Sequence, residues 1–131
     1  MLRQVTYIST VSADMPYEDV RSIVSLSRSA NAQREVTGLL FYNGRNFLQV
    51  LEGDNAVLRS LMSLIIQDPR HAGVSVLANV EIMARSFPQW SMRLLQLSES
   101  VEERRSCIDG LLPAQMDGAT RRAILNYAML N

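Results

Sequence analysis

The N-terminal segment 2–10 is rich in β-branched and aromatic residues, and its successive side chains alternate between two faces, which is typical of a β-strand. Val5 and Tyr7 fall on one face of this strand, and Ile8 falls on the other. From residue 17 to 30 the apolar residues instead recur at helical intervals. We therefore expect an amphipathic helix after the first strand.

A hairpin and a second helix are predicted next. The apolar runs 36–42 and 46–52 flank Asn43-Gly44, a pair of residues typical of a tight turn. Between residues 54 and 68 a helical stripe of apolar residues returns. Because its apolar face needs cover, we expect this helix to pack on the same sheet as the first.

Two further strands, 74–83 and 91–97, complete the pattern. The resulting order, β-α-β-β-α-β-β, predicts an α+β fold of the ferredoxin-like type, in which two helices cover one face of a mainly antiparallel sheet. A fold of this kind does not by itself define a function.

The C-terminal part departs from this core pattern. Residues 99–105 and 118–130 predict two short helices. We therefore divide the chain into a sensor-sized domain, residues 1–97, and a helical extension, residues 98–131, that serves output or oligomerisation. An exposed face of the sheet would also favour a homo-oligomer.

Composition narrows the classes of function. The 131 residues suit one domain, and 13 basic residues balance 13 acidic ones. This balance offers no broad attraction to nucleic acid or to a membrane surface, so we expect neither as a partner. The single cysteine, Cys107, rules out an internal disulfide, and the lack of an apolar leader indicates a cytoplasmic protein.

Gln49 is a polar residue inside an otherwise apolar run suited to a central strand. A buried amide without partners costs roughly 1–3 kcal/mol, so a polar group should meet it. The partner could be a ligand, or the side chain could simply bond to backbone at a strand edge.

Four other residues are candidates for a site, each with an ordinary alternative. Asn31 extends the core-facing stripe of the first helix, or it caps that helix. Tyr7 could border a ring-shaped ligand, or it is a core aromatic whose hydroxyl finds a partner. Trp90 and Met92 stand two apart on a predicted strand and so should share a face, where they contact a site or pack in the core.

Several short motifs occur together in order. They are Thr6-Tyr7-Ile8-Ser9, Asn31 with Val36-Thr37-Gly38-Leu39-Leu40, Asn43-Gly44, Phe47-Leu48-Gln49-Val50-Leu51-Glu52-Gly53, Asp68-Pro69-Arg70-His71 and Trp90-Ser91-Met92. In residues and in spacing, this set closely resembles the BLUF family, the blue-light sensors using FAD. The resemblance runs from about residue 2 to residue 97.

The resemblance implies an FAD ring held non-covalently between the two helices. In isolated protein, FMN or riboflavin would be bound in place of FAD. Ile23 and Ile65 match the apolar residues that flank the ring, and Asn31 matches the residue that bonds its polar edge. Gln49 matches the amide between flavin and tyrosine, and Tyr7 matches the electron donor. Arg70, in a loop that could equally be solvated, would contact the ribityl or phosphate part.

The family's photochemistry implies that light changes the hydrogen bonds of Gln49, with Trp90 and Met92 flanking it. The signal would pass to a separate effector protein, and no enzymatic turnover is needed. Members of the family often carry a second polar or aromatic residue beside this asparagine, whereas Ala30 and Ala32 adjoin Asn31 in this chain. The detailed environment of the ring is therefore left open. Rival interpretations are a small acyl phosphate hydrolase, a flavin oxidoreductase and a pure protein-interaction domain, but no paired nucleophile and base supports an enzyme.

Overall fold

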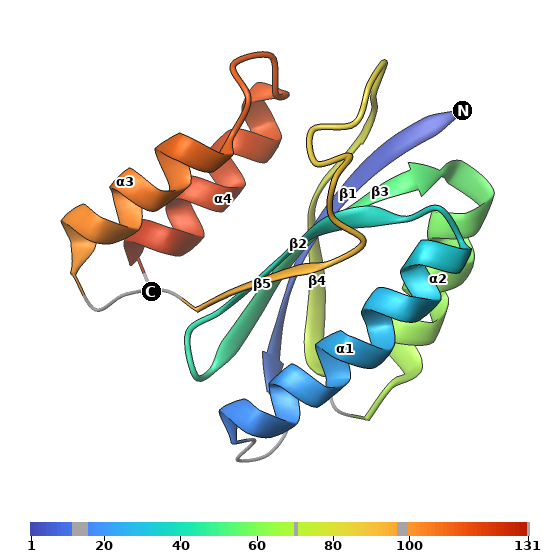
Figure 1. Cartoon of the computed structure of the whole chain (residues 1–131), viewed down its shortest axis with the longest axis horizontal. Helices are drawn as coiled ribbons and strands as arrows, with labels where there is room; N and C mark the ends of the chain where they lie inside the picture. Colours follow the sequence, from blue (N-terminus) through green and yellow to red (C-terminus); the bar gives the residue numbers. More distant parts are fainter. Residues whose placement is uncertain (12–15, 70, 97–99, 131) are drawn as a thin grey trace.

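A computed structural model describes residues 1–11, 16–69, 71–96 and 100–130 of the chain (Figure 1). In chain order the elements are β1 (Leu2–Val11), α1 (Tyr17–Gln33), β2 (Thr37–Tyr42), β3 (Asn46–Asp54), α2 (Asn55–Gln67), β4 (His71–Glu81), β5 (Arg93–Gln96), α3 (Val101–Leu111) and α4 (Gly118–Leu130). The predicted order is confirmed. Within the described ranges no helix is both long and apolar enough to cross a membrane.

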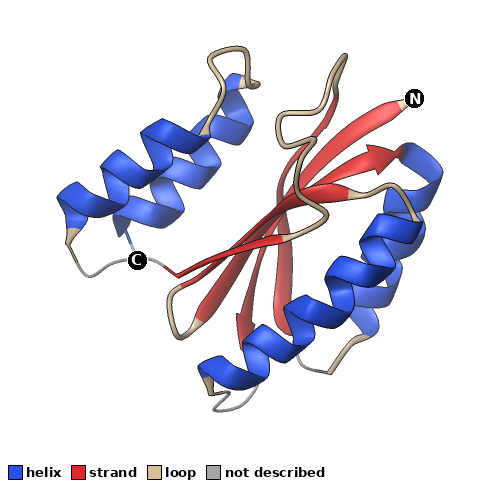
Figure 2. Ribbon diagram, in the orientation of Figure 1, coloured by secondary structure: helices blue, strands red, loops and turns tan. Residues whose placement is uncertain are grey.

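The five strands form one sheet in the order β4-β1-β3-β2-β5 (Figure 2). The pairs among β1 to β4 are antiparallel, and β5 runs parallel to β2. Helices α1 and α2 cover one face, as the ferredoxin-like prediction requires, while α3 and α4 lie on the other (Figure 1). The sheet is therefore the middle layer of three.

The hairpin between β2 and β3 forms where the sequence predicts it. The Asn43 side-chain oxygen accepts hydrogen bonds from the backbone N–H groups of Arg45 and Asn46, which closes the turn. Gly44 takes a positive φ of 94° there, a conformation that glycine adopts at no steric cost. The turn fixes the register that places Gln49 opposite Leu40.

β5 is shorter than the predicted strand 91–97. Its pairing with β2 begins at Arg93, because the carbonyl groups of Ser91 and Met92 accept hydrogen bonds from side chains of α1 instead. Leu97 lies outside the described residues. The two residues before β5 are thus held by a helix and not by the sheet.

The two faces of the sheet carry separate apolar clusters. The first core cluster lies under α1 and α2 and consists of Val5, Tyr7, Val20, Val24, Val36, Leu40, Tyr42, Phe47, Leu51, Leu58 and Met92. The second core cluster lies under α3 and α4 and consists of Leu39, Phe41, Leu48, Val50, Phe87, Ile108, Leu112, Met116, Ile124, Tyr127 and Ala128. Alternation along β1, β2 and β3 produces this division.

The second core cluster corrects two expectations about the C-terminal part. The helices α3 and α4 are not separate from the core, because Ile108 and Ile124 are fully buried against the sheet. The sheet face expected to be exposed is covered along its central strands, and the Tyr127 hydroxyl donates to the Asn46 carbonyl at 2.7 Å. Self-association through that face loses its main argument, and a homo-oligomer stays a prediction.

A buried carboxylate ties the segment before β5 to the sheet. Glu52, which is fully buried, accepts from the backbone N–H of Ser86 at 2.7 Å and of Phe87 at 3.0 Å. Its oxygens also accept from the side chains of Gln4 and Thr37. Four donors satisfy one carboxylate, so the path that leads to residue 92 is fixed at its start.

Candidate functional site

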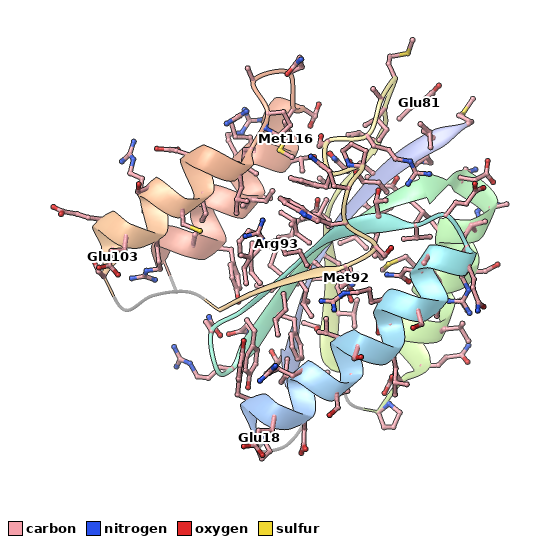
Figure 3. The ribbon with its side chains drawn as sticks, in the orientation of Figure 1. Glu18, Glu81, Met92, Arg93, Glu103 and Met116 are labelled. Atoms are coloured by element: carbon pink, nitrogen blue, oxygen red, sulfur yellow. The ribbon has the colours of Figure 1, made fainter. Side chains whose placement is uncertain are left out.

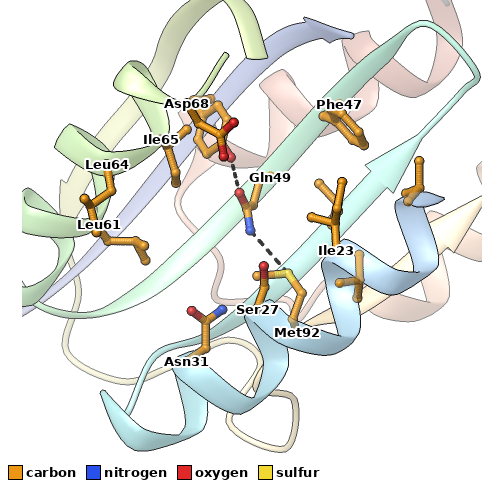
Figure 4. A pocket seen from close by; sticks show the side chains of 14 residues that line it. Ile23, Ser27, Asn31, Phe47, Gln49, Leu61, Leu64, Ile65, Asp68 and Met92 are labelled. Atoms are coloured by element: carbon orange, nitrogen blue, oxygen red, sulfur yellow. Dashed lines mark hydrogen bonds between the residues drawn. The ribbon is translucent and has the colours of Figure 1, made fainter. Parts of the chain in front are cut away.

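A cavity of about 180 Å³ lies between α1, α2 and the sheet (Figure 4). Its lining consists of Tyr7, Val20, Ile23, Val24, Ser27, Asn31, Leu40, Phe47, Gln49, Leu61, Leu64, Ile65, Asp68 and Met92. The side walls are mostly aliphatic, and the polar side chains are Tyr7 and Gln49 on the sheet, Ser27 and Asn31 on α1, and Asp68 after α2. This is the usual composition of a small-molecule site.

Tyr7 and Gln49 are neighbours on the cavity floor. They are register partners on β1 and β3, and the Tyr7 hydroxyl donates a hydrogen bond to Gln49 Oε1. The sheet places their side chains on the same face, because paired residues of adjacent strands project together. The register itself therefore creates the pair.

The other end of the same amide points at a sulfur atom. Gln49 Nε2 donates to the Sδ atom of Met92 at 3.3 Å. Thioether sulfur is a weak acceptor, so this end of the amide is held less firmly than the oxygen end. The alternative that Gln49 bonds backbone at a strand edge is wrong, since β3 is flanked by β1 and β2 and the partners are side chains.

Asn31 lies within α1 and faces the sheet. It is 3% exposed, and its Nδ2 donates to the Ser91 carbonyl at 3.0 Å. The alternative that it caps the helix is wrong, because α1 continues to Gln33 and Arg34 occupies the cap position. Its side-chain oxygen remains available to a ligand at the cavity edge.

The phenol of Tyr7 is strongly biased toward its protonated form. Burial, and then the negative charge of Asp68, raise the pKa of Tyr7 far above its ordinary value of 10.0. At neutral pH the hydroxyl therefore carries its proton and acts as a donor to Gln49.

Asp68 is a cavity residue to which the sequence analysis gave no role in the site, although it belongs to one of the motifs of the resemblance. It follows the last turn of α2 and lines the cavity with Leu61 and Ile65. Leu61 and Ile65 are four apart and share one face of α2, and Asp68 follows three positions later, just beyond the helix end. That spacing was the available signal, but a carboxylate after a helix end reads equally well as a cap.

The prediction that Trp90 and Met92 share a face is wrong. Met92 is 2% exposed and belongs to the first core cluster, at the cavity. Trp90 packs against the second core cluster, where its ring stacks on Phe87 at 6.0 Å and lies under Arg93. The two residues precede β5 and are not on a regular strand, so the rule of alternating faces does not apply to them.

The remaining predicted residues divide into two groups. Ile23 on α1 and Ile65 on α2 both line the cavity, and their contact with a flavin ring, which the resemblance implies, stays a prediction. Arg70 lies outside the described residues, so its predicted contact with the ribityl or phosphate part stays a prediction. Within the described ranges, His, Cys, Asp and Glu side chains form no group of three that could hold a metal ion.

The fold and the cavity define a small ligand-binding domain in which a flat, partly polar ring can lie beside a tyrosine and a glutamine. The family described as sensors of blue light using FAD (BLUF) matches residues 2–93 of the chain. The chain belongs to this family.

Individual relatives agree with this assignment. The blue light- and temperature-regulated antirepressor BluF of Escherichia coli K12 is 34% identical over 127 residues, which is 97% of this chain and 30% of the relative. BlrP1 of Klebsiella pneumoniae, solved with FMN and cyclic diGMP, superposes with a TM-score of 0.86 at 32% identity, covering 98% of this chain and 34% of that one. The chain thus spans about a third of the length of both proteins.

A third similar protein has nearly the length of this chain. BlrB, a BLUF protein solved in its dark state, is 34% identical with a TM-score of 0.75, covering 98% of this chain and 94% of that one. The likeness therefore extends to a short BLUF protein.

The residues of the cavity fit the family's cofactor, FAD. Ile23 and Ile65 offer apolar surface from opposite helices, which suits the two faces of a flat ring. The amides of Asn31 and Gln49 offer donors and acceptors, which suit the carbonyl and nitrogen edge of an isoalloxazine. The volume of the cavity lies below the roughly 300–1,000 Å³ of typical ligand sites, so we assign to it the ring and not the adenine end.

Proposed function

We propose that this chain converts blue light into a changed hydrogen-bond pattern at Gln49 and passes that change to a separate effector protein. The observation that carries the proposal is the double engagement of one buried amide. Gln49 accepts from Tyr7 at its oxygen and donates to Met92 at its nitrogen. An amide held in this way can exchange its donor and acceptor ends by turning or by tautomerisation.

The chain's own residues supply a route for a proton. The cofactor contributes absorption of blue light and the oxidising power of its excited state. Tyr7 is a protonated phenol whose hydroxyl already points at Gln49 Oε1, so the proton of an oxidised tyrosine can pass to the amide. When electron and proton return to Tyr7, no redox product remains, and the signal is the new orientation of Gln49.

Other residues are assigned to holding the cofactor. Ile23 and Ile65 flank the ring, Asn31 bonds its polar edge, and Arg70 contacts the ribityl or phosphate part. Met92 holds the place beside Gln49, while Trp90 lies on the other face of the sheet.

Two substitutions test the proposed switch. Tyr7→Phe removes the donor and Gln49→Leu removes the relay, and both keep the approximate shape of the side chain. Each variant should bind flavin and stay yellow, yet show no red shift of its absorption band under blue light. Tyr42→Phe is the matched control, because Tyr42 is buried in the same core cluster but does not line the cavity. A normal red shift in both site variants would refute the proposal.

The effector and the domain division belong to the same proposal. We assign residues 1–97 to light sensing and residues 98–131, with α3 and α4, to output or oligomerisation. The E. coli relative is described as an antirepressor and the Euglena relatives as subunits of photoactivated adenylate cyclases, so relatives of this sensor act on different outputs. This variety supports a sensing and not a catalytic role for the chain. We propose the cytoplasm as its location.

A further inference from the structure

A second hollow, a polar groove of about 780 Å³, lies between α1 and β5. It is lined by Tyr17, Glu18, Arg21, Ser22, Val24, Ser25, Arg28, Arg93 and Leu94. Residues 18, 21, 25 and 28 follow one another at helical spacing and form one stripe along α1. The first residue of this stripe, Glu18, lies in the first turn of the helix (Figure 3). Arg21 and Arg28 against one carboxylate, Glu18, give the α1 side of the groove a net positive charge.

β5 leaves the edge of the sheet open beside this groove. β2 pairs with one side of β5, and β5 ends the strand order. The backbone N–H and C=O groups on its outer side have no strand partner among the described residues. An open edge of this kind is a template for an extended peptide.

The arginines of α1 have unused hydrogen-bonding capacity. Arg21 is exposed and has no ion-pair partner in the part of the chain that the structure describes. Arg28 donates through Nε to the Met92 carbonyl at 3.0 Å, which leaves the two terminal nitrogens of its guanidinium for another acceptor. Arg93 differs, because its guanidinium lies over the Trp90 ring at 4.5 Å. A forked guanidinium is suited to a carboxylate.

We propose that this groove binds an extended acidic segment of a partner protein, which adds to the sheet along β5 and places carboxylates on Arg21 and Arg28. The backbone of β5 supplies hydrogen bonds, and the α1 stripe selects the charge. Such a contact is small and electrostatic, so it favours fast and reversible association.

Arg28 also connects the groove to Gln49, and this connection rests on the proposed function. Arg28 holds the Met92 carbonyl, and the Met92 sulfur accepts from Gln49. A change in the partner of Gln49 therefore alters the position of Met92 and the freedom of Arg28. By reciprocity, the affinity of the groove for an acidic segment differs between the dark and illuminated states.

The docking site is tested in the dark on the full chain. The probe is a short fluorescein-labelled peptide in which glutamate alternates with threonine, and a peptide with lysine in place of glutamate is its counterpart. Fluorescence anisotropy should show binding of the acidic peptide alone, and Arg21→Glu should weaken it at least about fivefold. Arg59→Glu, a matched change at an exposed arginine of α2, should alter binding less than about twofold.

Equal weakening by the two charge reversals, or equal binding of the two peptides, would overturn the docking site. Hydrogen exchange supplies an independent readout. The amides of residues 93–96 should gain protection when the acidic peptide is present, because strand addition engages them. Peptide binding without that protection would overturn strand addition.

Arg28→Lys tests the connection to the light site. Lysine keeps the positive charge but lacks the forked group that spans the Met92 carbonyl and a carboxylate, so binding in the dark should weaken less than in Arg21→Glu. Light should change peptide affinity in the unaltered chain and not in this variant. An unchanged light effect in Arg28→Lys would overturn the connection. Absence of any light-induced spectral shift in the unaltered chain would refute the proposed function. The peptide-binding assay in the dark would still test whether the groove binds an acidic segment.

Discussion

Glu52→Gln is the change whose cost can be worked most directly from the structure. Oε1 accepts from the Thr37 hydroxyl and the Phe87 N–H, and Oε2 accepts from the Gln4 amide and the Ser86 N–H. An amide can present only one oxygen. The Thr37 hydroxyl can turn and the Gln4 amide can flip to accept from the new NH₂ group, but a backbone N–H can do neither.

Whichever way the new amide points, one backbone N–H therefore faces another donor. If the amide nitrogen replaces Oε1, Phe87 loses its acceptor, and if it replaces Oε2, Ser86 does. An unsatisfied buried donor costs about 1–3 kcal/mol, and the loss of the charge on the acceptor weakens the bonds that remain. We expect the free energy of unfolding to fall by about 2–3 kcal/mol.

Urea unfolding followed by far-UV circular dichroism measures this loss. The midpoint should fall while the slope stays constant, because the fold and its buried surface are retained. Glu81→Gln is the matched control, since Glu81 is exposed on β4 and should change stability by less than about 0.5 kcal/mol. A loss at Glu52 no larger than that of the control would refute the reasoning.

Three further predictions concern the cavity and the C-terminal helices. Met92→Leu keeps the volume but removes the sulfur that accepts from Gln49 Nε2, so the fold should lose less than about 1.5 kcal/mol while the rate of return from the light-induced state, followed by absorbance, should change. Tyr127→Phe deletes the hydrogen bond to the Asn46 carbonyl and should lower the free energy of unfolding in urea by about 1 kcal/mol. Burial and Asp68 raise the pKa of Tyr7 in the folded protein. The contribution of protonated Tyr7 to the free energy of unfolding is therefore complete below the ordinary tyrosine pKa of 10.0 and is lost as pH rises above that value. The red shift should keep its amplitude from roughly pH 6 to pH 9, and a loss with a midpoint in that range would contradict a buried phenol.

The local patterns of the chain were sufficient for the order of elements, and they singled out Tyr7 and Gln49 as candidates, while the pairing of the two came only from the family resemblance. Alternation along the first strand placed Tyr7 on the helix-covered face, and a lone amide in an apolar run identified Gln49. Both signals work because a regular strand has a fixed period of two. The prediction that Trp90 and Met92 share a face was wrong because neither residue lies on a regular strand, so the period of two does not apply to them.

The contacts that the sequence did not predict join segments far apart in the chain. Arg28 and the Met92 carbonyl are 64 positions apart, and Glu52 and the Ser86 N–H are 34 apart. In both bonds one partner is a backbone group, and backbone groups are the same at every position of a sequence. Only the three-dimensional path of residues 82–92 shows which polar side chain meets which backbone group.

The weakness of the bond between Gln49 and Met92 has a consequence for switching. To shift a two-state equilibrium from 1:99 to 99:1, a perturbation must favour one state by about 5.5 kcal/mol. A strong acceptor at the nitrogen end of the Gln49 amide would add to the energy that light has to overcome. The thioether of Met92 accepts only weakly, while Tyr7 holds the oxygen end of the amide firmly. In the proposed switch, the unequal partners favour one orientation of the Gln49 amide before illumination and leave the alternative within reach of a change in protonation at Tyr7.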